Sequence, residues 1–454
     1  MYQDCNRGAG TRNHPHNGSS QNETSVNQMR ILTDQLKENI DQEITVAGWV
    51  HELRDLGGIK FLLLRDRKGL VQITFLKEKV STALFQQFSQ LGREDVIKVT
   101  GVVSTSDIAQ MGIEVFPTAI TMLSEADSPL PLDPAQKVKA DFDTRLNHRV
   151  LDLRSHSHRL IFQVKACLIS GFREFLEKEG FCEVQTPKIV ATGTEGGTEL
   201  FPLHYFEKEA FLAQSPQFYK QMLVGAGFER VYEVGPVYRA EEHNTVRHIN
   251  EYTSLDLEFG FIEDDRDIRE LENRLLLFMF GKLKRECSEQ LEVLQADAPE
   301  VPGEIPSITF EEAQEIAGEK GFDLSPQGEK AVCDYSQESL NSEFIFITAY
   351  PQEKRPVYAM PNGDVTKSFD LLLRGTEVTT GGQRIHQYDL LVEKMTERGL
   401  DPSDFEFYLE VFKYGMPPHG GFAVGAERLA MQTLNLSNIR EATFFPRDRN
   451  RLVP

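Results

Sequence analysis

The sequence predicts an α+β protein in which an all-β module precedes a larger part that mixes strands with long helices. Residues 29–130 consist of short alternating apolar runs separated by Gly, Asp and Lys, which is typical of a small β-barrel. Further along, the apolar runs 231–237 and 255–261 flank a highly charged centre and predict two antiparallel strands joined by a long loop. Segments with helical periodicity at 160–180 and 266–294 supply the helices.

The composition limits the class of protein. At 454 residues the chain is long enough for two or three domains. Its 40% apolar and 26% charged residues are typical of a soluble globular protein, and no run approaches the ~18 apolar residues of a membrane span. The N-terminus lacks the apolar core of a secretory signal, and the five cysteines show no CxxC spacing. We therefore expect no membrane association, reduced thiols, no zinc site and a cytoplasmic location.

Residues 1–28 are rich in Asn, Gly, Ser and His and almost without aliphatic side chains. Such a segment buries too little apolar surface to offset the entropy lost on ordering, so we expect a disordered tail. Two interpretations stay open. The tail is either an artefact of an upstream start codon, with Met29 opening the natural protein, or a regulatory or RNA-binding extension.

Five strands with one intervening helix fit an oligonucleotide-binding (OB) barrel. The expected strands are 44–53, 59–66, 69–76, 95–103 and 113–123, and the helix 81–90 falls between the third and fourth. Prolines from Pro129 to Pro134 then predict a stiff extended connector. The expected order of parts is a tail at 1–28, the OB barrel at 29–130, a hinge at 131–154 and a second domain at 155–454 with a small helical insertion near 297–341.

Two arginine-bearing stretches carry the chemistry. Arg239 and Arg247 lie at the edges of the charged loop, where two guanidiniums form a bidentate clamp for a polyphosphate. On a lone hairpin the same residues would form only incidental ion pairs at a solvated tip. The second stretch, Gly420–Leu434, predicts a glycine-rich turn that feeds a helix with Glu427 and Arg428 in its first turn. Because the helix macrodipole opposes an arginine there, Arg428 is expected to have another role.

These stretches resemble signature motifs of the class II aminoacyl-tRNA synthetases. Arg239–Glu241 is similar to the second motif and Gly425–Arg428 to the third, while Gly180–Pro187 resembles the first, which ends in an interface proline. The C-terminal segment Phe444–Pro454, FFPRDRNRLVP, looks like the aspartyl-specific ending of the archaeal and eukaryotic-like branch. The resemblance covers roughly residues 29–454.

The resemblance implies a class II catalytic domain with an antiparallel sheet flanked by helices. It also implies that the chain uses ATP and Mg²⁺ to activate L-aspartate and to charge tRNA(Asp), and that it forms a homodimer through the helix and strand between 160 and 185. A net charge of −21 argues, taken alone, against a nucleic-acid partner. A tRNA nevertheless needs only a local basic stripe, with binding that weakens sharply as salt rises.

By match to the motifs, Arg239 holds the α-phosphate of ATP, and Arg247 holds the γ-phosphate end together with His248. Tyr252 and Arg428 sandwich the adenine between a ring face and a guanidinium plane. The other ATP-binding positions implied by the resemblance are Glu241, Glu377, Gly425, Ala426 and Glu427. Because positioning and charge stabilisation dominate such chemistry, Arg239, Arg247 and Arg428 are the expected catalytic residues.

Hard oxygen ligands for Mg²⁺ are expected at Asp370 and Glu377. Their odd spacing would place them on opposite faces of one straight strand, but a turn at Arg374–Gly375 between two short strands would bring them together. The family has Asp and Glu at these two positions. Thr380 stands where relatives of this branch often have Ser. The resemblance therefore supports metal coordination by its hydroxyl less directly than coordination by the two carboxylates.

The side-chain carboxylate of aspartate is expected at Arg384, an arginine fork backed by the point charge of Lys220. The other aspartate-binding positions implied by the resemblance are Glu195, Ser215, Gln217, Asp256 and Thr380. Glu195 belongs to the glycine-rich loop 191–200, which is expected to close over the amino acid. Asparagine would present amide donors to the donors of Arg384, and sites built in this way can discriminate by ~10⁴–10⁵.

In the barrel, the resemblance assigns the anticodon to four residues. Phe61 stacks on the central base, Arg54 and Gln72 hydrogen-bond the bases, and Glu114 reads the third base. Stacking on an aromatic ring contributes ~1–3 kcal/mol per base. Without the resemblance, Phe61 would be interpreted as an ordinary core residue of a strand.

Two further positions bear on tRNA discrimination, because the anticodons of tRNA(Asp) and tRNA(Asn) differ only in the third base. His51 stands where relaxed members of the family carry His and strict members carry Gln, which favours charging of both tRNAs. Gln110 matches neither pattern. A strictly discriminating enzyme, an asparaginyl enzyme and a catalytically inactive RNA-binding relative are the alternatives; the context of Arg384 and the C-terminal ending weigh against the second, and the intact arginine set against the third.

Overall fold

The computed structural model of the chain describes residues 30–109, 111–193, 200–242 and 244–454. The chain divides into two compact units between Leu130 and Pro131. The predicted α+β fold is confirmed, with a barrel in the first unit and a large sheet with helices in the second. The predicted tail at 1–28 and the candidate residues Gln110 and Glu195 lie outside the described residues. Within the described ranges, every helix is too short or too polar to span a bilayer.

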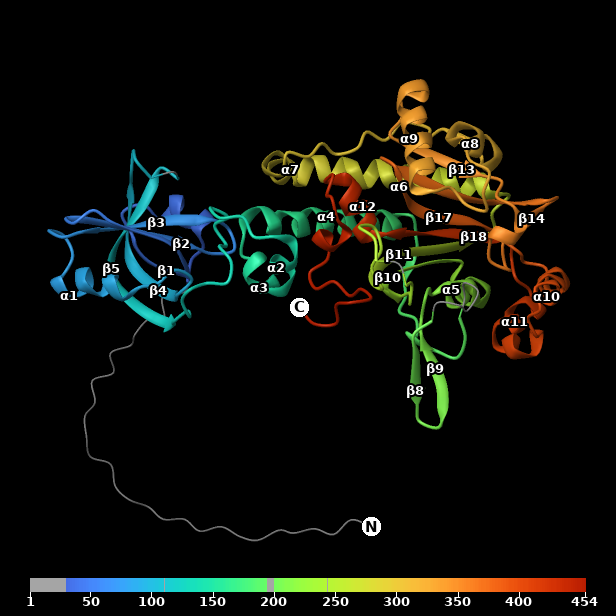
Figure 1. Cartoon of the computed structure of the whole chain (residues 1–454), viewed down its shortest axis with the longest axis horizontal. Helices are drawn as coiled ribbons and strands as arrows, with labels where there is room; N and C mark the ends of the chain where they lie inside the picture. Colours follow the sequence, from blue (N-terminus) through green and yellow to red (C-terminus); the bar gives the residue numbers. More distant parts are fainter. Residues whose placement is uncertain (1–29, 110, 194–199, 243) are drawn as a thin grey trace, which may run out of the picture. The chain divides into compact units, whose positions relative to one another are not determined.

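The first unit is a closed five-stranded barrel in the order β1–β2–β3–β5–β4 (Figure 1). Its strands are β1 (Glu43–Asp55), β2 (Ile59–Arg65), β3 (Leu70–Leu76), β4 (Val96–Thr105) and β5 (Ile113–Ser124). Helix α1 (Thr82–Gln87) follows β3 as predicted. Alternate strand residues point into the barrel, so Leu62 and Leu64 of β2 are buried while Phe61 is partly exposed.

The second unit is built on an eight-stranded sheet in the order β12–β13–β16–β17–β18–β11–β10–β6. The strands are β6 (Cys182–Glu183), β10 (Arg230–Tyr238), β11 (Glu251–Gly260), β12 (Ser307–Thr309), β13 (Phe344–Thr348), β16 (Ser368–Leu373), β17 (Thr376–Arg384) and β18 (His419–Gly425). Pairing is antiparallel from β13 to β10, and β12 and β6 are added at the edges as parallel strands. The predicted antiparallel pair around the charged loop is β10 and β11.

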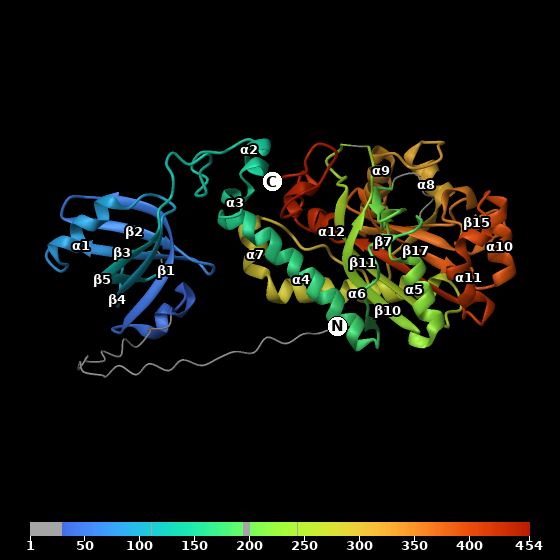
Figure 2. The same ribbon diagram turned by 90° about the horizontal axis from the view of Figure 1, so that it is seen from below.

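Helices α4 (His156–Lys178) and α6 (Asp265–Glu286) lie side by side against one face of this sheet, and α7 (Ser288–Leu294) follows α6 and packs against α4 (Figures 1 and 2). The single helix predicted at 266–294 is therefore wrong in one respect. It breaks at Cys287, whose backbone (φ −128°, ψ 24°) leaves the helical region before α7 begins. The smaller helices are α2 (Phe142–Asn147), α3 (Arg149–Asp152), α5 (Gln217–Leu223), α8 (Phe310–Ala317), α9 (Pro326–Leu340), α10 (Tyr388–Glu397), α11 (Glu406–Lys413) and α12 (Ala426–Thr433).

The second half of the segment predicted as an extended hinge is helical, because α2 and α3 form there. Arg149 of α3 is buried, and its guanidinium donates to the carbonyl oxygens of Thr443 at 2.7 Å and Phe444 at 3.0 Å. Asp152 accepts a further hydrogen bond from the same guanidinium. Residues 142–152 are thus fixed to the C-terminal segment of their own unit.

The glycine-rich turn predicted at the start of the second arginine stretch is wrong. Gly420 and Gly421 lie in strand β18. A Cβ atom on Gly421 would meet the Leu257 carbonyl oxygen at 2.1 Å, and one on Gly420 would meet Ile268 Cδ1 at 2.3 Å. Glycine is required here because the neighbouring strand and helix α6 approach β18 closely.

One ionisable group is enclosed between α6 and the sheet. Glu272 is fully buried, and burial raises the pKa of its carboxyl group to about 8, a shift that the Thr379 hydroxyl reduces and the Asp370 charge reinforces. The folded protein therefore keeps this carboxyl group protonated at neutral pH.

Replacing Glu272 with Gln should stabilise the protein more at about pH 8 than at about pH 5. The carboxyl group ionises near its ordinary pKa of 4.5 in the unfolded chain but holds its proton to about 8 in the folded one, so the parent protein loses stability as pH rises between these values. Urea unfolding of both proteins at the two pH values measures the difference. The exposed Glu270→Gln variant on the same helix is the control; a pH-independent difference for Glu272→Gln would refute the assignment.

Candidate active site

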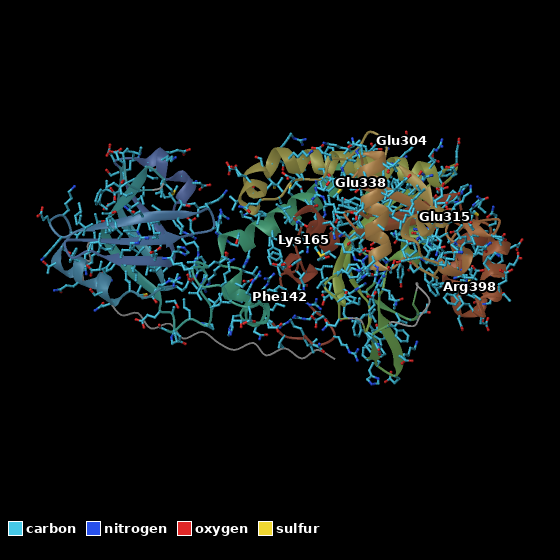
Figure 3. The ribbon with its side chains drawn as sticks, turned by 45° about the horizontal axis from the view of Figure 1, so that its top comes forward. Phe142, Lys165, Glu304, Glu315, Glu338 and Arg398 are labelled. Carbon is cyan, nitrogen blue, oxygen red and sulfur yellow. The ribbon has the colours of Figure 1, made fainter. Side chains whose placement is uncertain are left out.

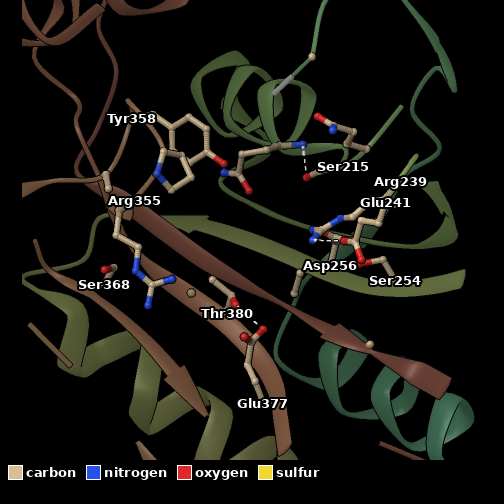
Figure 4. Close-up of a pocket in the computed structure, with 18 of the residues that line it drawn as sticks. Ser215, Arg239, Glu241, Ser254, Asp256, Arg355, Tyr358, Ser368, Glu377 and Thr380 are labelled. Atoms are coloured by element: carbon tan, nitrogen blue, oxygen red, sulfur yellow. Dashed lines mark hydrogen bonds and ion pairs between the residues drawn. The ribbon is translucent and has the colours of Figure 1, made fainter. Parts of the chain in front are cut away.

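The candidate active site is a cavity of about 730 Å³ over β11, β17 and β18 (Figure 4). The alternation of side chains along β11 explains its position. Leu255 and Leu257 point into the core shared with α4 and α6, whereas Ser254 and Asp256 line the cavity. The cavity therefore lies on the sheet face opposite these helices.

The loop between β10 and β11 brings both predicted clamp arginines to the cavity wall. Its ends are closed by hydrogen bonds from the Arg239 amide to the Asn250 carbonyl oxygen (2.9 Å) and from Asn250 Nδ2 to the Arg239 carbonyl oxygen (2.7 Å). Arg239 Nη1 lies 3.9 Å from Glu241 Oε1. Arg247 Nη1 lies 2.8 Å from Glu329 Oε2 of helix α9. The two guanidiniums thus share one cavity, each beside a carboxylate.

Arg440 supports this loop from the C-terminal segment. It is buried, and it donates from Nη1 to the Thr245 carbonyl oxygen at 3.0 Å and from Nη2 to Asn244 Oδ1 at 2.6 Å. Its Nε donates to Asp448 Oδ2 at 2.6 Å. Thr245 Oγ1 in turn lies 2.5 Å from Nδ1 of His248, which also lines the cavity. The C-terminal ending singled out in the sequence, which begins at Phe444, also contacts the arginine-bearing loop, because Arg449 Nη1 donates to the Glu242 carbonyl oxygen at 3.1 Å.

The proposed adenine contacts come from Tyr252 and Arg428, which both line the cavity. The Arg239 guanidinium lies 5.8 Å from the centre of the Tyr252 ring. Burial raises the pKa of the Tyr252 phenol, so this ring is neutral. Arg428 Nη1 donates to the Glu377 carbonyl oxygen at 3.1 Å.

The other third-motif residues have structural contacts. Glu427 accepts hydrogen bonds from Lys165 Nζ of α4 at 2.5 Å and from the Thr253 amide at 2.9 Å, so both of its carboxylate oxygens are engaged (Lys165 is labelled in Figure 3). Ala426 belongs to the core. Gly425 lines the cavity at the N-cap of α12.

Arg384, at the end of β17, lines the cavity and is held by polar groups. Its Nε donates to Glu258 Oε1 at 3.0 Å, and its Nη2 donates to the Gly421 carbonyl oxygen at 3.0 Å. Gln217 Nε2 donates to the other Glu258 oxygen at 3.0 Å. Burial would raise the pKa of Glu258, but the charges of Arg384 and Lys220 outweigh it and lower the pKa. The Arg384–Glu258 pair is therefore ionised and fixed.

Lys220 of α5 is fully buried behind the cavity wall. Its Nζ donates to Asp256 Oδ1 at 2.8 Å and to the Leu257 carbonyl oxygen at 3.3 Å. Asp256, Ser215 and Gln217 line the cavity. Lys220 thus contacts Asp256 and does not itself line the cavity, whereas the sequence predicted a position beside the substrate.

Asp370 and Glu377 flank the predicted turn, in which Arg374 (φ 48°) and Gly375 (φ 87°) connect β16 to β17. Thr380 Oγ1 donates to Glu377 Oε1 at 2.9 Å. Burial raises the pKa of Glu377, and the Asp370 charge raises it further. The described residues contain no group of three His, Cys, Asp or Glu placed to hold a metal. Two carboxylates and a hydroxyl form a donor set that suits Mg²⁺ completed by phosphate and water.

Several charged residues of the site were missed from the sequence, among them Arg355, Glu258 and Glu329. Arg355 lines the cavity, lies 3.6 Å from the centre of the Tyr350 ring and pairs with Asp370 Oδ2 at 2.7 Å. Glu258 is two residues beyond Asp256 on β11, so it lies on the same face of the strand. The period of two along a strand could have predicted this position. Glu329 and Arg355 come from segments without a recognisable motif. Their contacts with Arg247 and Asp370 are therefore visible only in the folded structure.

The four predicted anticodon residues share one face of the barrel. Arg54 of β1 pairs across the ladder with Phe61 of β2, and Gln72 of β3 pairs with Glu114 of β5. Gln72 Nε2 donates to Glu114 Oε2 at 3.1 Å. Phe61 pairs with Thr74, two residues beyond Gln72, which joins the two pairs into one surface.

His51 lies at an irregularity of β1, where the register with β2 shifts between Val50 and Glu52. Its Nδ1 is 2.9 Å from Arg65 Nη1. Burial lowers the pKa of His51, and the Arg65 charge lowers it further, so the ring is neutral at neutral pH. A bulge of this kind re-aims a side chain from its strand.

Comparison with known proteins identifies the family. Residues 141–449 match the family described as tRNA synthetases class II (D, K and N), and residues 44–123 match the OB-fold nucleic acid binding domain. The chain belongs to the class II tRNA synthetases of this group. Membership implies the use of ATP, and the predicted OB barrel is confirmed.

Two curated relatives and one solved structure show the degree of similarity. The chain is 50% identical to the aspartate–tRNA(Asp/Asn) ligase of Methanopyrus kandleri, over 93% of this chain and 98% of the relative. It is 49% identical to the aspartate–tRNA(Asp) ligase of Pyrococcus abyssi, over 91% and 96%. The asparaginyl-tRNA synthetase of Pyrococcus horikoshii with asparaginyl-adenylate superposes with a TM-score of 0.88 at 30% identity, over 94% of this chain and 99% of that one.

Replacing Arg440 with Met should loosen the loop that carries Arg247. Loss of the guanidinium removes two hydrogen bonds to residues 244–245, while Asp448 keeps the backbone donors of Asn450 and Arg451. Hydrogen–deuterium exchange should therefore become faster in 244–248. Arg451→Met, which removes a contact to Asn147 instead, is the control. Unchanged exchange in Arg440→Met would contradict the supporting role.

Proposed function

We propose that this chain is an ATP-dependent aspartate–tRNA ligase that forms aspartyl-adenylate and transfers the aspartyl group to the 3′-terminal ribose of tRNA(Asp). The observation that carries the proposal is that one cavity contains three arginines of two kinds. Arg384 is held by Glu258, and Arg239 and Arg247 form the clamp. An arginine fork suits a side-chain carboxylate, and a pair of arginines suits a polyphosphate. The aspartate ligase names of relatives near 50% identity support the same substrate.

In the first step, an α-carboxylate oxygen of aspartate attacks the α-phosphorus of ATP, and the bond to the pyrophosphate oxygen breaks. Arg239 stabilises charge on the α-phosphate, and Arg247 with His248 holds the γ-phosphate end. Tyr252 and Arg428 hold the adenine. In the second step the terminal ribose hydroxyl attacks the adenylate carbonyl carbon and AMP leaves. The residues contribute alignment and charge rather than covalent chemistry.

Magnesium fits the carboxylates on the two sides of the turn between β16 and β17. Asp370 Oδ2 is held by Arg355, which leaves Oδ1, and Glu377 lies nearby with Thr380. Burial and the nearby Asp370 charge raise the pKa of Glu377, and a divalent cation would favour its ionised form. We infer that Asp370 and Glu377, with Thr380 as a further oxygen, hold Mg²⁺, which neutralises phosphate charge when bound.

Aspartate is proposed to lie with its side-chain carboxylate on Arg384 and its α-amino group near Asp256, Ser215 and Gln217. Glu258 engages Arg384 at Nε, so the pair fixes the orientation of the guanidinium that the substrate meets. Asparagine would oppose its amide donors to these N–H groups. This arrangement favours aspartate over asparagine.

Arg384→Gln should raise the KM for aspartate by about 100-fold or more, because loss of a buried charge partner costs ~2–5 kcal/mol. The KM for ATP should change little. Aspartate-dependent ATP–pyrophosphate exchange measures both, with the exposed Arg266→Gln as control. Near-normal kcat/KM for aspartate would overturn the role of Arg384.

The same exchange assay on the unaltered protein separates the alternative functions. Exchange with asparagine would favour an asparaginyl enzyme, and no exchange with either amino acid would favour a non-catalytic RNA-binding relative.

We also propose that the enzyme charges tRNA(Asn) with aspartate. The support is His51, at the bulge of β1, and the Asp/Asn type named for a relative at 50% identity. Relaxed selection requires only that one base contact be lost, which is worth ~1–3 kcal/mol by analogy with duplex readout. Anticodon binding is assigned to Arg54, Phe61, Gln72 and Glu114.

Charging of tRNA(Asn) transcript with labelled aspartate tests this proposal. The kcat/KM should lie within a thousandfold (~4 kcal/mol) of that for tRNA(Asp). A larger deficit would show strict discrimination. His51→Gln should lower charging of tRNA(Asn) selectively, whereas equal loss on both tRNAs would indicate a general defect of the barrel.

We further infer a homodimer and a cytoplasmic location. From the family resemblance we expect the dimer contact on α4 and β6. The outward side of α4 bears a groove between Ala166, Ile169 and Arg173, which is consistent with such a contact. Cytoplasmic location agrees with the free thiols of Cys167, Cys182, Cys287 and Cys333.

A further inference from the structure

Arg247 is held by a residue from outside the signature motifs. Glu329 lies in the first turn of α9, within the insertion that the sequence leaves without a function. Arg247 Nη1 donates to Glu329 Oε2 at 2.8 Å, and Nη2 lies 3.4 Å from Oε1. The side chains are only 18% and 12% exposed, so the pair is largely shielded from solvent. Such a shielded, two-point pair fixes the plane of a guanidinium.

Glu329 also contacts the strand that carries the candidate magnesium ligand. The Glu377 amide donates to Glu329 Oε2 at 3.3 Å. One carboxylate therefore connects α9, the clamp loop and β17. Removing it would free Arg247 from a fixed position relative to Glu377.

Helix α9 is a rigid base for this contact. The Ser325 side chain caps it by accepting the Gly328 amide at 3.1 Å. Val332 and Cys333 are buried against Ile345 and Leu372 of the sheet. Because Glu329 is in the first turn, the helix dipole also favours its negative charge.

The pairing leaves Arg247 able to bind phosphate. A guanidinium has five N–H donors, and an end-on pair with a carboxylate uses two of them. The remaining donors stay available to an anion. Glu329 therefore orients the arginine without occupying its whole donor set.

We propose that Glu329 is a positioning residue for ATP: it holds the Arg247 guanidinium in the orientation that receives the γ-phosphate end, and the insertion is thereby part of the nucleotide site. The inference depends on the proposed function, because it assigns Arg247 to ATP. It adds a partner for that arginine from α9.

The test compares Glu329→Gln with Glu338→Gln, a matched change at an exposed position of the same helix (Glu338 is labelled in Figure 3). At metal sites, removing the residue that orients a ligand lowers metal affinity or activity by about 10–100-fold. By analogy, we expect the KM for ATP to rise by about tenfold or more in Glu329→Gln. The KM for aspartate should stay unchanged, and Glu338→Gln should match the parent. If Glu329→Gln fails to fold, Glu329→Asp, which keeps the charge but shortens the reach, must give the same selective rise.

A double-mutant cycle with Arg247→Lys separates positioning from a general structural role. If Glu329 acts through Arg247, then Glu329→Gln should change the ATP affinity measured by calorimetry much less in the Arg247→Lys background than in the parent. Equal effects in both backgrounds, or an equal rise in the KM for aspartate, would overturn the proposal. Absence of aspartate-dependent exchange in the unaltered enzyme would instead refute the proposed function itself, while the coupling between Glu329 and Arg247 in ATP affinity would still be measurable.

Discussion

The cavity depends on the pairing of buried charges. Six cations in or behind its wall each lie beside a carboxylate: Arg239 with Glu241, Arg247 with Glu329, Arg355 with Asp370, Arg384 with Glu258, Lys220 with Asp256 and Arg428 with Glu377. The pairs of Arg355, Arg384 and Lys220 are buried on both sides. A buried charge without a partner costs several kcal/mol, so these three cations can be held in place only if they are paired. The carboxylates thus fix the cations before any substrate binds, which limits reorganisation during the reaction.

The sheet makes this pairing possible because its two faces have different roles. The apolar side chains of β11, such as Leu255 and Leu257, pack with α4 and α6, while the intervening Asp256 and Glu258 face the substrate side. Glycines at 420 and 421 let β18 approach its neighbours closely. The alternation of side chains along β11 therefore builds the core on one face and presents acidic groups on the other. These acidic groups form ion pairs with Arg384 and Lys220.

Local patterns predicted part of this site. The apolar runs around Arg239 and Arg247 gave strands β10 and β11, and the odd spacing of Asp370 and Glu377 gave the turn at Arg374–Gly375. The break of the long helix at Cys287, the burial of Lys220 and the partners supplied by Glu329 and Arg355 could not be predicted, because each depends on contacts between segments far apart in the chain. The strand position of Gly420 was missed for the same reason, since glycine signals a turn unless the neighbouring strands are known.

Binding of stable aspartyl- and asparaginyl-adenylate analogues tests most directly whether the paired cations of the cavity define an aspartate site. Calorimetry on the unaltered protein measures both affinities without chemistry or tRNA. The aspartyl analogue should bind more tightly by a large factor, of the order of 10⁴ for a site whose donors face a carboxylate. Equal binding of the two analogues, or tighter binding of the asparaginyl analogue, would contradict it.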